Sequence, residues 1–443
     1  MSEEDIADKI KDYSDQVSNI STLEVDGKVT KVVGMVIEAS LPNTSIGELC
    51  YIKTPKGNKV RAEVVGFRES QTLLMPLDKT VGVSSGCTIT RSPEPMSITI
   101  NPQILGRVLD GLWNPMDNKQ QIDSGVKWPV YNTPPNPLKR TRINEIMPTG
   151  VKAIDGLATL GRGQRIGIFA GSGVGKSVLL GMIARYAEAD VNVIALVGER
   201  GREVREFIER DLGEEGLKKS VVIVATSDQA PMVRVKAALT ATAVSEYFRD
   251  RGKNVMLLMD SLTRVAMAKR EIGLAAGEPP ATKGYTPSVF GFLPKLLERT
   301  GTSQNGSITA IYSVLVEGDD LSEPVSDTAR SILDGHIVLD RDLANSGHYP
   351  AIDVLGSISR LKDQVIDEKH RQNSIRFLEL LAKYKEQEDL INIGAYESGT
   401  NPELDKAIEN IDQINDFLTQ DISEHYSYEE TVNKLNNFIN NID

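Results

Sequence analysis

The sequence predicts a multidomain α/β protein with an N-terminal β-barrel, a central parallel sheet covered by helices, and a C-terminal helical domain. Short β-rich runs broken by turn residues fill residues 25–95. Residues 96–360 are expected to contain a linker followed by strands that alternate with helix-length segments, and polar helical patterns follow over residues 361–443. A separate segment at residues 1–24 precedes the barrel, so we expect these four domains or segments in chain order.

The segment at residues 1–24 is predicted to be a short amphipathic helix. Ile6, Ile10, Tyr13 and Val17 recur at three- and four-residue spacing, with acidic and basic residues between them. A helix with one apolar stripe must cover that stripe. Either the helix packs on its own domain or it docks on a helix of a partner.

The barrel prediction rests on β-rich runs at Lys28–Ile37 and Lys59–Phe67. Pro42–Asn43 and Pro55–Gly57 supply turn residues between the runs. The proline-rich stretch Thr133–Pro137 is typical of a linker, because proline favours extended chain and stops helices.

The alternating region predicts a mostly parallel sheet covered on both faces. The apolar runs expected to form its strands, besides the one before residue 170, are Val191–Val197, Val221–Ala225, Val255–Met259 and Ile308–Val316. Beyond residue 360, helix-like runs at residues 377–381 and 404–411 predict a helical domain.

Composition limits the classes of function. The 443 residues carry 50 Lys and Arg against 62 Asp and Glu, a net charge of −12, which argues against a broad nucleic-acid-binding surface. Cys50 and Cys87 are the only cysteines, which is typical of a reducing compartment. The N-terminus lacks an apolar signal core, and no run approaches the ~18 apolar residues of a membrane span. We therefore expect a cytoplasmic protein.

Ala170–Ser177 has the pattern of a phosphate-binding loop. The run lies between the strand-like Arg165–Phe169 and the helix-like Val178–Arg185, which is the context such a loop requires. Glycines let successive N–H groups face phosphate oxygens, and the helix N-terminus favours anions. Ala170 stands where glycine is usual, which requires a negative φ there. The predicted nucleotide-binding residues of the loop are Gly171, Ser172, Gly173, Val174, Gly175, Lys176, Ser177 and Val178, with Lys176 on the β- and γ-phosphates and Ser177 on Mg²⁺.

Two carboxylates end predicted strands. Asp260 follows the run that ends at Met259, where an acidic residue helps to hold Mg²⁺; the alternative is a helix N-cap. Glu199 could polarise the attacking water from the lip of the nucleotide crevice. Its alternative is a surface ion pair with a nearby arginine such as Arg200, which spacing alone favours.

Two residues near the end of the alternating region are further candidates. Tyr349 could stack on a purine, and Arg360 could act on the nucleotide of a neighbouring subunit. The alternative for both is an ordinary surface or packing residue. The four histidines have no metal-ligand spacing, so a zinc site is not expected.

Together, the motifs at residues 170–177, 197–207, 259–264 and 349–360 resemble the type III secretion ATPases. The resemblance is closer to the flagellum-specific protein-export ATPases, which are relatives of the catalytic β subunit of rotary ATP synthases. It covers nearly the whole chain, and the stretch at residues 388–396 favours the flagellar branch.

The resemblance implies a RecA-like central domain, an ATPase activity that uses Mg²⁺, and a role for each motif residue. Alanine at position 170 is also common in this family. The implied roles are P-loop lysine for Lys176, Mg²⁺ ligand for Ser177, catalytic glutamate for Glu199, phosphate-side arginine for Arg200, Walker B carboxylate for Asp260, adenine-stacking ring for Tyr349 and arginine finger for Arg360.

The resemblance also implies partners. We expect a homo-hexamer, a peripheral-stalk-like regulator at the N-terminal helix, and a central coiled-coil stalk protein near Gly284–Pro287. An export-gate membrane protein and export chaperone–substrate complexes are the other expected partners, with the protein on the cytoplasmic side of the membrane export apparatus.

Four alternatives remain open at this point. They are a virulence-type secretion ATPase, a catalytic rotary ATP synthase subunit, a non-catalytic nucleotide-binding subunit and an RNA translocase of the transcription-terminator type. The acidic charge and the lack of an aromatic and basic patch in residues 25–95 count against the last of these.

Overall fold

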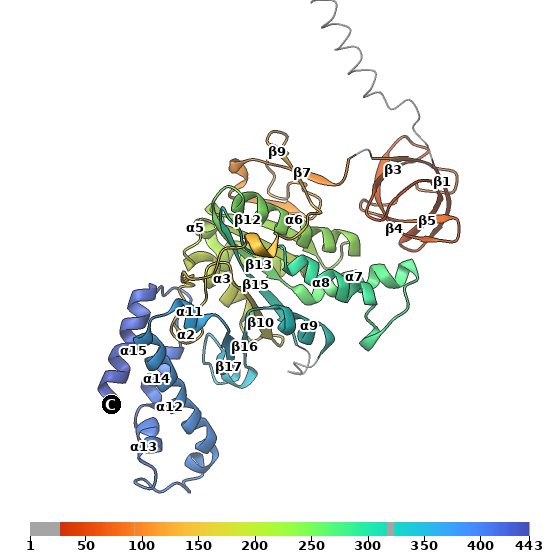
Figure 1. Ribbon diagram of the computed structural model, residues 1–443. Helices are drawn as coiled ribbons and strands as arrows, with labels where there is room; N and C mark the ends of the chain where they lie inside the picture. Colours follow the sequence, from red (N-terminus) through yellow and green to blue (C-terminus); the bar gives the residue numbers. More distant parts are fainter. Residues whose placement is uncertain (1–26, 93, 317–322, 443) are drawn as a thin grey trace, which may run out of the picture. The chain divides into compact units, whose positions relative to one another are not determined.

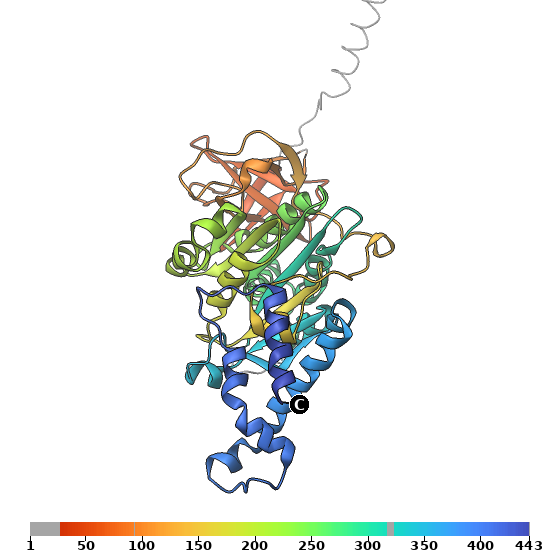
Figure 2. The ribbon, with the colours of Figure 1, turned by 90° about the vertical axis from the view of Figure 1, so that its left-hand side faces the viewer.

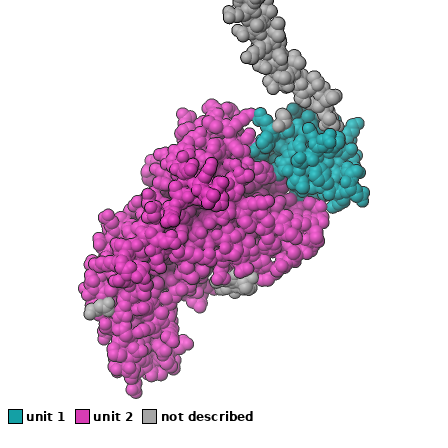
Figure 3. All heavy atoms as spheres, in the orientation of Figure 1, with its two compact units in different colours: residues 1–96 teal, residues 97–443 magenta. Residues whose placement is uncertain are grey.

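The computed structural model describes residues 27–92, 94–316 and 323–442. The helix predicted within residues 1–24 therefore lies outside the described residues. The chain forms two compact units, with the boundary between Met96 and Ser97 (Figure 3). Each unit is described by itself below.

The first unit is a closed, six-stranded antiparallel barrel in the order β1-β2-β5-β4-β3-β6 (Figure 1), as predicted. Its strands are β1 (Gly27–Val33), β2 (Val36–Ser40), β3 (Leu49–Lys53), β4 (Lys59–Arg68), β5 (Gln71–Pro76) and β6 (Thr88–Arg91). Closure leaves no free strand edge, and alternate residues such as Ile37, Ile52 and Leu74 point inward and are fully buried.

One predicted strand of the barrel is in fact a hairpin. The run Lys28–Ile37 turns back at Gly34, which adopts a φ of +57°, and Val33 then pairs with Val36. Glycine takes this left-handed conformation without steric cost, so the turn is possible within an otherwise continuous β-rich run.

The second unit is built on a nine-stranded sheet, ordered β17-β16-β10-β15-β13-β11-β12-β8, with β14 paired to β15 (Figure 1). Every pairing is parallel except β14–β15 and β16–β17. The strands are β8 (Arg107–Asp110), β10 (Arg165–Ala170), β11 (Val191–Glu199), β12 (Ser220–Thr226), β13 (Asn254–Asp260), β14 (Gly301–Thr302), β15 (Ser307–Leu315), β16 (Gly335–Leu339) and β17 (Ile352–Ser359). The predicted parallel sheet is therefore present.

Helices cover both faces of this sheet, as the continuous apolar runs of its strands require. Alternate strand residues such as Ile166 and Ile168 share one core cluster with Leu180 of helix α3, while α6 packs against β11, β12 and β13. The helices between and beside the strands are α2 (Lys152–Leu157), α3 (Lys176–Tyr186), α4 (Gly201–Glu206), α5 (Gly213–Lys218), α6 (Pro231–Arg249), α7 (Leu262–Ala276), α8 (Pro287–Leu297), α9 (Pro324–Ile332), α10 (Arg341–Asn345) and α11 (Lys362–Val365).

The C-terminal region is helical, as predicted, and its helices gather at the end of the unit that carries the C-terminus (Figures 1 and 2). They are α12 (Glu368–Asn392), α13 (Pro402–Glu409), α14 (Ile411–Leu418) and α15 (Tyr428–Ile442). The ring of Phe377 lies 5.1 Å from that of Phe417 and 5.3 Å from that of Phe438, so α12, α14 and α15 share one aromatic core. The predicted single run at residues 404–411 is divided at Asn410 between α13 and α14.

Two further features complete the fold. Strands β7 (Ser97–Ile100) and β9 (Val126–Pro129) form a small antiparallel sheet at the start of the second unit. Thr133–Asn136, in the stretch predicted to be a linker, has no helix or strand and lies within the second unit; a 3₁₀ turn follows at Pro137–Lys139. In the described residues, no helix has the length and apolar character needed to cross a membrane.

Candidate nucleotide-binding site

The predicted phosphate-binding loop connects the end of β10 to the first turn of α3. Gly173 and Gly175 have φ values of +81° and +86°, which turn the backbone as the loop requires. Ala170 is the last residue of the extended strand β10 and has no positive φ, so alanine is compatible with this position. Val174 is only 2% exposed and packs into the core beneath the loop.

Lys176 reaches both predicted carboxylates from the first residue of α3. Its Nζ donates a hydrogen bond to Asp260 Oδ1 and lies 3.9 Å from Glu199 Oε1. Because β10, β11 and β13 are parallel, their carboxyl ends meet at one edge of the sheet. This arrangement brings the three residues together in space although they lie far apart in the sequence.

Asp260 is a buried acceptor and not a helix cap. It accepts a second hydrogen bond, of 2.6 Å, from Ser313 Oγ on β15. Ser261 is the N-cap of α7, because its hydroxyl accepts a hydrogen bond from the backbone N–H of Arg264. Ser313 was not among the predicted site residues, although it is a polar residue in the apolar run of a predicted strand.

Glu199 is buried, with 8% of its surface exposed, so the surface ion pair considered above is not what the structure contains. Burial and the nearby charge of Asp260 raise the pKa of Glu199 to about 7, against the opposing effect of Lys176. Gly198 precedes it with a φ of +75°, and a Cβ there would lie 2.6 Å from Cδ of Arg264. Only glycine fits this position without displacing the arginine.

Arg264, and not Arg200, is the arginine that contacts Glu199. Its Nε lies 3.5 Å from Glu199 Oε1, and its guanidinium donates a hydrogen bond to the carbonyl of Gly198. Arg200 is largely exposed and pairs with Glu203 at 3.0 Å. The hydrogen bond that the carboxyl of Glu199 donates lowers the pKa of Glu203 below its ordinary range. Arg264 and Glu203 were missed because nothing in their spacing says which way they point.

Two neighbouring cavities share the loop. One, of about 320 Å³, is lined by Glu199, Glu203 and Arg264 together with most of the loop. The other, of about 820 Å³, is lined by Tyr349 and by residues of the C-terminal helical region. Gly173, Gly175 and Val178 line both cavities. The smaller cavity is polar and could hold phosphate groups, and the larger cavity beside it is lined by the aromatic ring of Tyr349.

Tyr349 lies directly against the loop, although its side chain remains 45% exposed. A Cβ on Gly175 would be 3.4 Å from its ring. The backbone carbonyl of Tyr349 accepts a hydrogen bond from the N–H of Gln420, which belongs to the C-terminal helical region. The side chain of Gln420 accepts from Lys152 N–H and donates to Gly150 O, so one buried residue joins three segments at the larger cavity.

Arg360 does not reach this site within its own chain. Strand β17 runs antiparallel to β16, so Ser359 lies opposite Gly335, whereas Ile352 lies opposite Leu339. Ala170, where the loop begins, is level with Leu339. Four residues of strand therefore separate the two ends, about 13 Å at 3.3 Å per residue. Arg360 therefore follows β17 at the end of the sheet opposite to the end that carries the loop.

The residues present fit an Mg²⁺–nucleotide complex. Ser177 lies in the first turn of α3, and Asp260 lies at the end of β13. The hydroxyl of one and the carboxylate of the other are oxygen ligands of the kind that Mg²⁺ binds together with phosphate oxygens and water. The buried Nε of Arg264 has no hydrogen-bond acceptor among the described residues, which suits an anionic ligand. In the same ranges no group of three or more His, Cys, Asp or Glu residues could bind a metal without the nucleotide.

Comparison with known proteins gives the family. Residues 150–359 match the ATP synthase alpha/beta family nucleotide-binding domain, and residues 29–93 match the beta-barrel domain of the same family. Residues 366–437 match the T3SS EscN ATPase C-terminal domain. These three matches follow the order of the barrel, the sheet and the C-terminal helices.

Individual relatives match over nearly their whole length. The flagellum-specific ATP synthase of Bacillus subtilis is 55% identical over 94% of this chain and 95% of the relative. The type 3 secretion system ATPase of Xanthomonas euvesicatoria is 50% identical over 92% and 93%. The assembled ATPase EscN from the enteropathogenic E. coli type III secretion system has a TM-score of 0.88 at 47% identity, over 93% of this chain and 100% of that chain. The chain therefore belongs to the ATP synthase alpha/beta family, among its flagellum-specific and type 3 secretion system ATPases.

Proposed function

We propose that this chain hydrolyses ATP with Mg²⁺ and that the hydrolysis drives or assists the export of flagellar proteins through a type III secretion apparatus. The observation that carries the hydrolytic part is the contact of Lys176 with Asp260 and Glu199 at the carboxyl edge of the sheet. A phosphate-binding loop and a buried carboxylate with a pKa of about 7 line one cavity there. The proposed metal-binding carboxylate, Asp260, accepts a hydrogen bond from the lysine of that loop.

Each residue of the site has a proposed role. Lys176 holds the β- and γ-phosphates, and Glu199 orients the attacking water and accepts its proton, for which a pKa of about 7 is well matched. Arg264 fixes the carboxylate of Glu199. Tyr349 stacks on the adenine in the larger cavity. Arg200, which is exposed at the rim, stabilises phosphate charge once its pairing with Glu203 is released.

Ser177 and Asp260 would hold Mg²⁺, the latter partly through water. Bound Mg²⁺ would neutralise negative charge on the β- and γ-phosphates. Ser313 keeps Asp260 oriented by donating to Oδ1. Lys176 releases Asp260 when phosphate oxygens arrive, because the ammonium group then has other anionic partners.

The position of Arg360 supports a shared active site. A residue at the opposite edge of the sheet serves catalysis only in a neighbouring subunit, so we propose a homo-hexamer in which Arg360 completes the adjoining site. Solved structures of the related ATPase EscN include the assembled protein and its complex with the central stalk EscO. A central coiled-coil stalk protein is accordingly the proposed partner of the ring.

The remaining expected partners and the location are also proposals. They are a peripheral-stalk-like regulator at the N-terminal helix, an export-gate membrane protein, and export chaperone–substrate complexes, with the ring on the cytoplasmic side of the membrane. The predicted domain boundaries at residues 24/25, 95/96 and 360/361 stay predictions.

A virulence-type secretion ATPase is the second candidate. It is supported by the match of residues 366–437 to the EscN C-terminal domain and by the 50% identity to the Xanthomonas relative. The 55% identity to the Bacillus flagellar relative favours the flagellar function.

The test is the Mg²⁺-dependent ATPase activity of the purified chain, measured against its own concentration, with Glu199→Gln as the control. We expect specific activity to rise steeply with concentration and to be abolished in the variant. A low activity that is independent of concentration and of Glu199 would reject the proposal and favour a passive nucleotide-binding subunit.

A further inference from the structure

Arg360 is held by its backbone at the edge of the sheet away from the phosphate-binding loop. Its N–H donates a 3.0 Å hydrogen bond to the carbonyl of Asp334, the residue before β16. Its guanidinium donates to the carbonyl of Arg330 at 3.2 Å and has no ion pair with any described residue. The charged group is therefore available to a ligand outside the chain, while its place depends on what holds Asp334.

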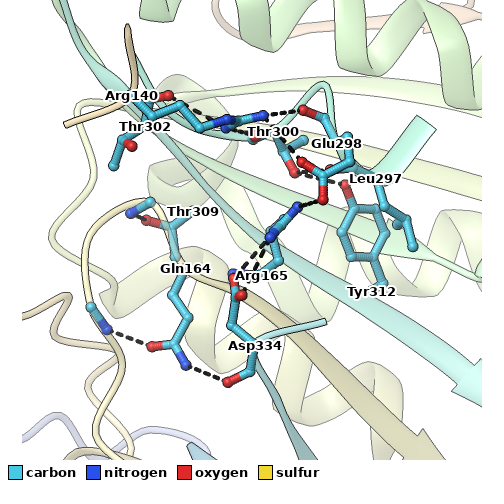
Figure 4. Close-up of polar contacts among 12 residues, drawn as sticks. Arg140, Gln164, Arg165, Leu297, Glu298, Thr300, Thr302, Thr309, Tyr312 and Asp334 are labelled. Carbon is cyan, nitrogen blue, oxygen red and sulfur yellow. Dashed lines mark hydrogen bonds and ion pairs between the residues drawn. The ribbon is translucent and has the colours of Figure 1, made fainter. Parts of the chain in front are cut away.

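Asp334 is clamped to the first residue of β10 (Figure 4). Its Oδ2 accepts hydrogen bonds from the backbone N–H of Arg165 at 3.0 Å and from Nε at 3.1 Å, and Oδ1 accepts from the guanidinium at 3.3 Å. The N–H of Asp334 in turn donates to Arg165 O at 2.8 Å. Four hydrogen bonds between two residues fix the carbonyl that anchors Arg360.

The clamp is itself supported from two sides (Figure 4). Arg165 forms a second ion pair with Glu298 at 2.5 Å, and Arg140 donates to the same carboxylate at 3.3 Å. Gln164 donates to the carbonyl of Asp334 at 3.1 Å. The cluster joins β10, the end of α8 and the segment after the linker, so it resists rotation of any one side chain.

The residue before Arg360 is anchored in the same way. Ser359 Oγ accepts a 3.0 Å hydrogen bond from Gln164 Nε2 and donates a 2.8 Å bond to Thr159 O. The neighbours Gln164 and Arg165, at the start of β10, thus hold Ser359 directly and Arg360 through Asp334. The same strand carries the phosphate-binding loop at its other end.

From this geometry we propose that Asp334 is the positioning residue of Arg360. Clamped by Arg165, it sets where the arginine lies when it enters the active site of the neighbouring subunit. This inference rests on the proposed function, in which Arg360 acts on the neighbouring subunit's nucleotide. A misplacement of about 1 Å at a reacting group lowers a rate about 10²-fold. Loss of the clamp therefore slows hydrolysis in the neighbouring site and leaves the chain's own ATP binding unchanged.

The test combines two variants with a mixing experiment. Asp334→Ala removes the clamp, and Asp334→Asn keeps the volume while removing the charge, in case the alanine variant does not fold. We expect turnover in rings of either variant to fall, by about 10²-fold for alanine. Equilibrium binding of ATP should stay within about twofold, since the loop and Tyr349 are untouched.

Mixing distinguishes positioning from general damage. Glu199→Gln subunits have no catalytic glutamate but keep Asp334 and Arg360, so they should restore the sites of Asp334 variants beside them. In an equal mixture turnover should return to about a quarter of the wild-type value, because half of the subunits have an intact site and half of those face an intact neighbour. A merely destabilised subunit would not be restored.

Two controls complete the design. Asp78→Asn breaks an arginine–aspartate pair of the same pattern in the barrel, where Arg61 donates its N–H, Nε and guanidinium to the carboxylate, and should leave turnover unchanged. Arg360→Ala mixed with Glu199→Gln tests the trans role itself. If that mixture regains no activity, the proposed shared site is wrong. If it does, but Asp334 variants are fully active or are not restored, only the positioning role is refuted.

Discussion

Replacing Gln420 with alanine is expected to weaken ATP binding much more than it slows turnover. The Gln420 side chain accepts the N–H of Lys152 at 2.9 Å and donates to the carbonyl of Gly150 at 2.8 Å. Both partners are buried, and the backbone N–H of Gln420 also donates to Tyr349 O. The side chain therefore ties the C-terminal wall of the larger cavity to the start of α2.

The magnitude follows from the two buried groups that lose a partner. Each unpaired buried donor or acceptor costs about 1–3 kcal/mol. The two groups that lose Gln420 therefore destabilise the contact between the C-terminal region and the start of α2 by about 2–6 kcal/mol, and a water molecule that enters and bonds to them reduces this cost. We expect KM for ATP to rise at least about tenfold, which corresponds to about 1.4 kcal/mol. The value of kcat should change little, because Lys176, Glu199 and Asp260 are untouched.

The assay is the ATPase rate as a function of ATP concentration, with thermal unfolding measured in parallel. Gln413→Ala is the matched control, since this exposed glutamine of α14 donates one hydrogen bond, of 3.3 Å, to Asn410 on the same surface. A KM within about twofold of the wild-type value in the Gln420→Ala variant would refute the reasoning. It would mean that Gln420 does not contribute to the binding of ATP.

Three further predictions concern the site and the core. Gly198→Ala should lower kcat at least about tenfold while ATP still binds in equilibrium measurements, because strain at φ +75° and contact with Arg264 displace the following carboxylate. Glu246→Ala should lower the free energy of unfolding in denaturant by about 3–5 kcal/mol, since the buried Arg299 loses its bidentate partner. Burial lowers the pKa of His370, so the folded state binds fewer protons than the unfolded state at mildly acidic pH. The contribution of this residue to thermal stability should therefore be fully present above about pH 6.5 and should decrease below it. That decrease should be absent in the His370→Gln variant.

Much of the site could be predicted because its parts are local in sequence. A strand, a glycine-rich turn and a helix specify a phosphate-binding loop within about 20 residues. Glu199 and Asp260 were predicted as the ends of apolar runs, and parallel strands bring such ends to one edge of a sheet. The pattern of apolar and glycine residues along the chain is therefore enough to predict these positions.

The missed residues have a different cause. Ser313 lies on a strand that was predicted, whereas Glu203 and Arg264 lie on helices whose bounds were not predicted; in all three cases the direction of the side chain depends on the packing of its neighbours. Gln420 contacts Lys152 across 268 positions of sequence, and no periodic pattern reports such a contact. Asp334 likewise gains its role only from the pairing of β10 with β16.

The sequence by itself determined the barrel, the alternating sheet, the helical C-terminal region and the loop with its two strand-end carboxylates, since hydrophobic periodicity and glycine positions are local properties. The tertiary structure decided which arginine contacts Glu199, that Ser261 rather than Asp260 caps the helix, and that Arg360 faces away from its own loop. These outcomes depend on strand order and direction, which set distances between residues that lie far apart in the chain.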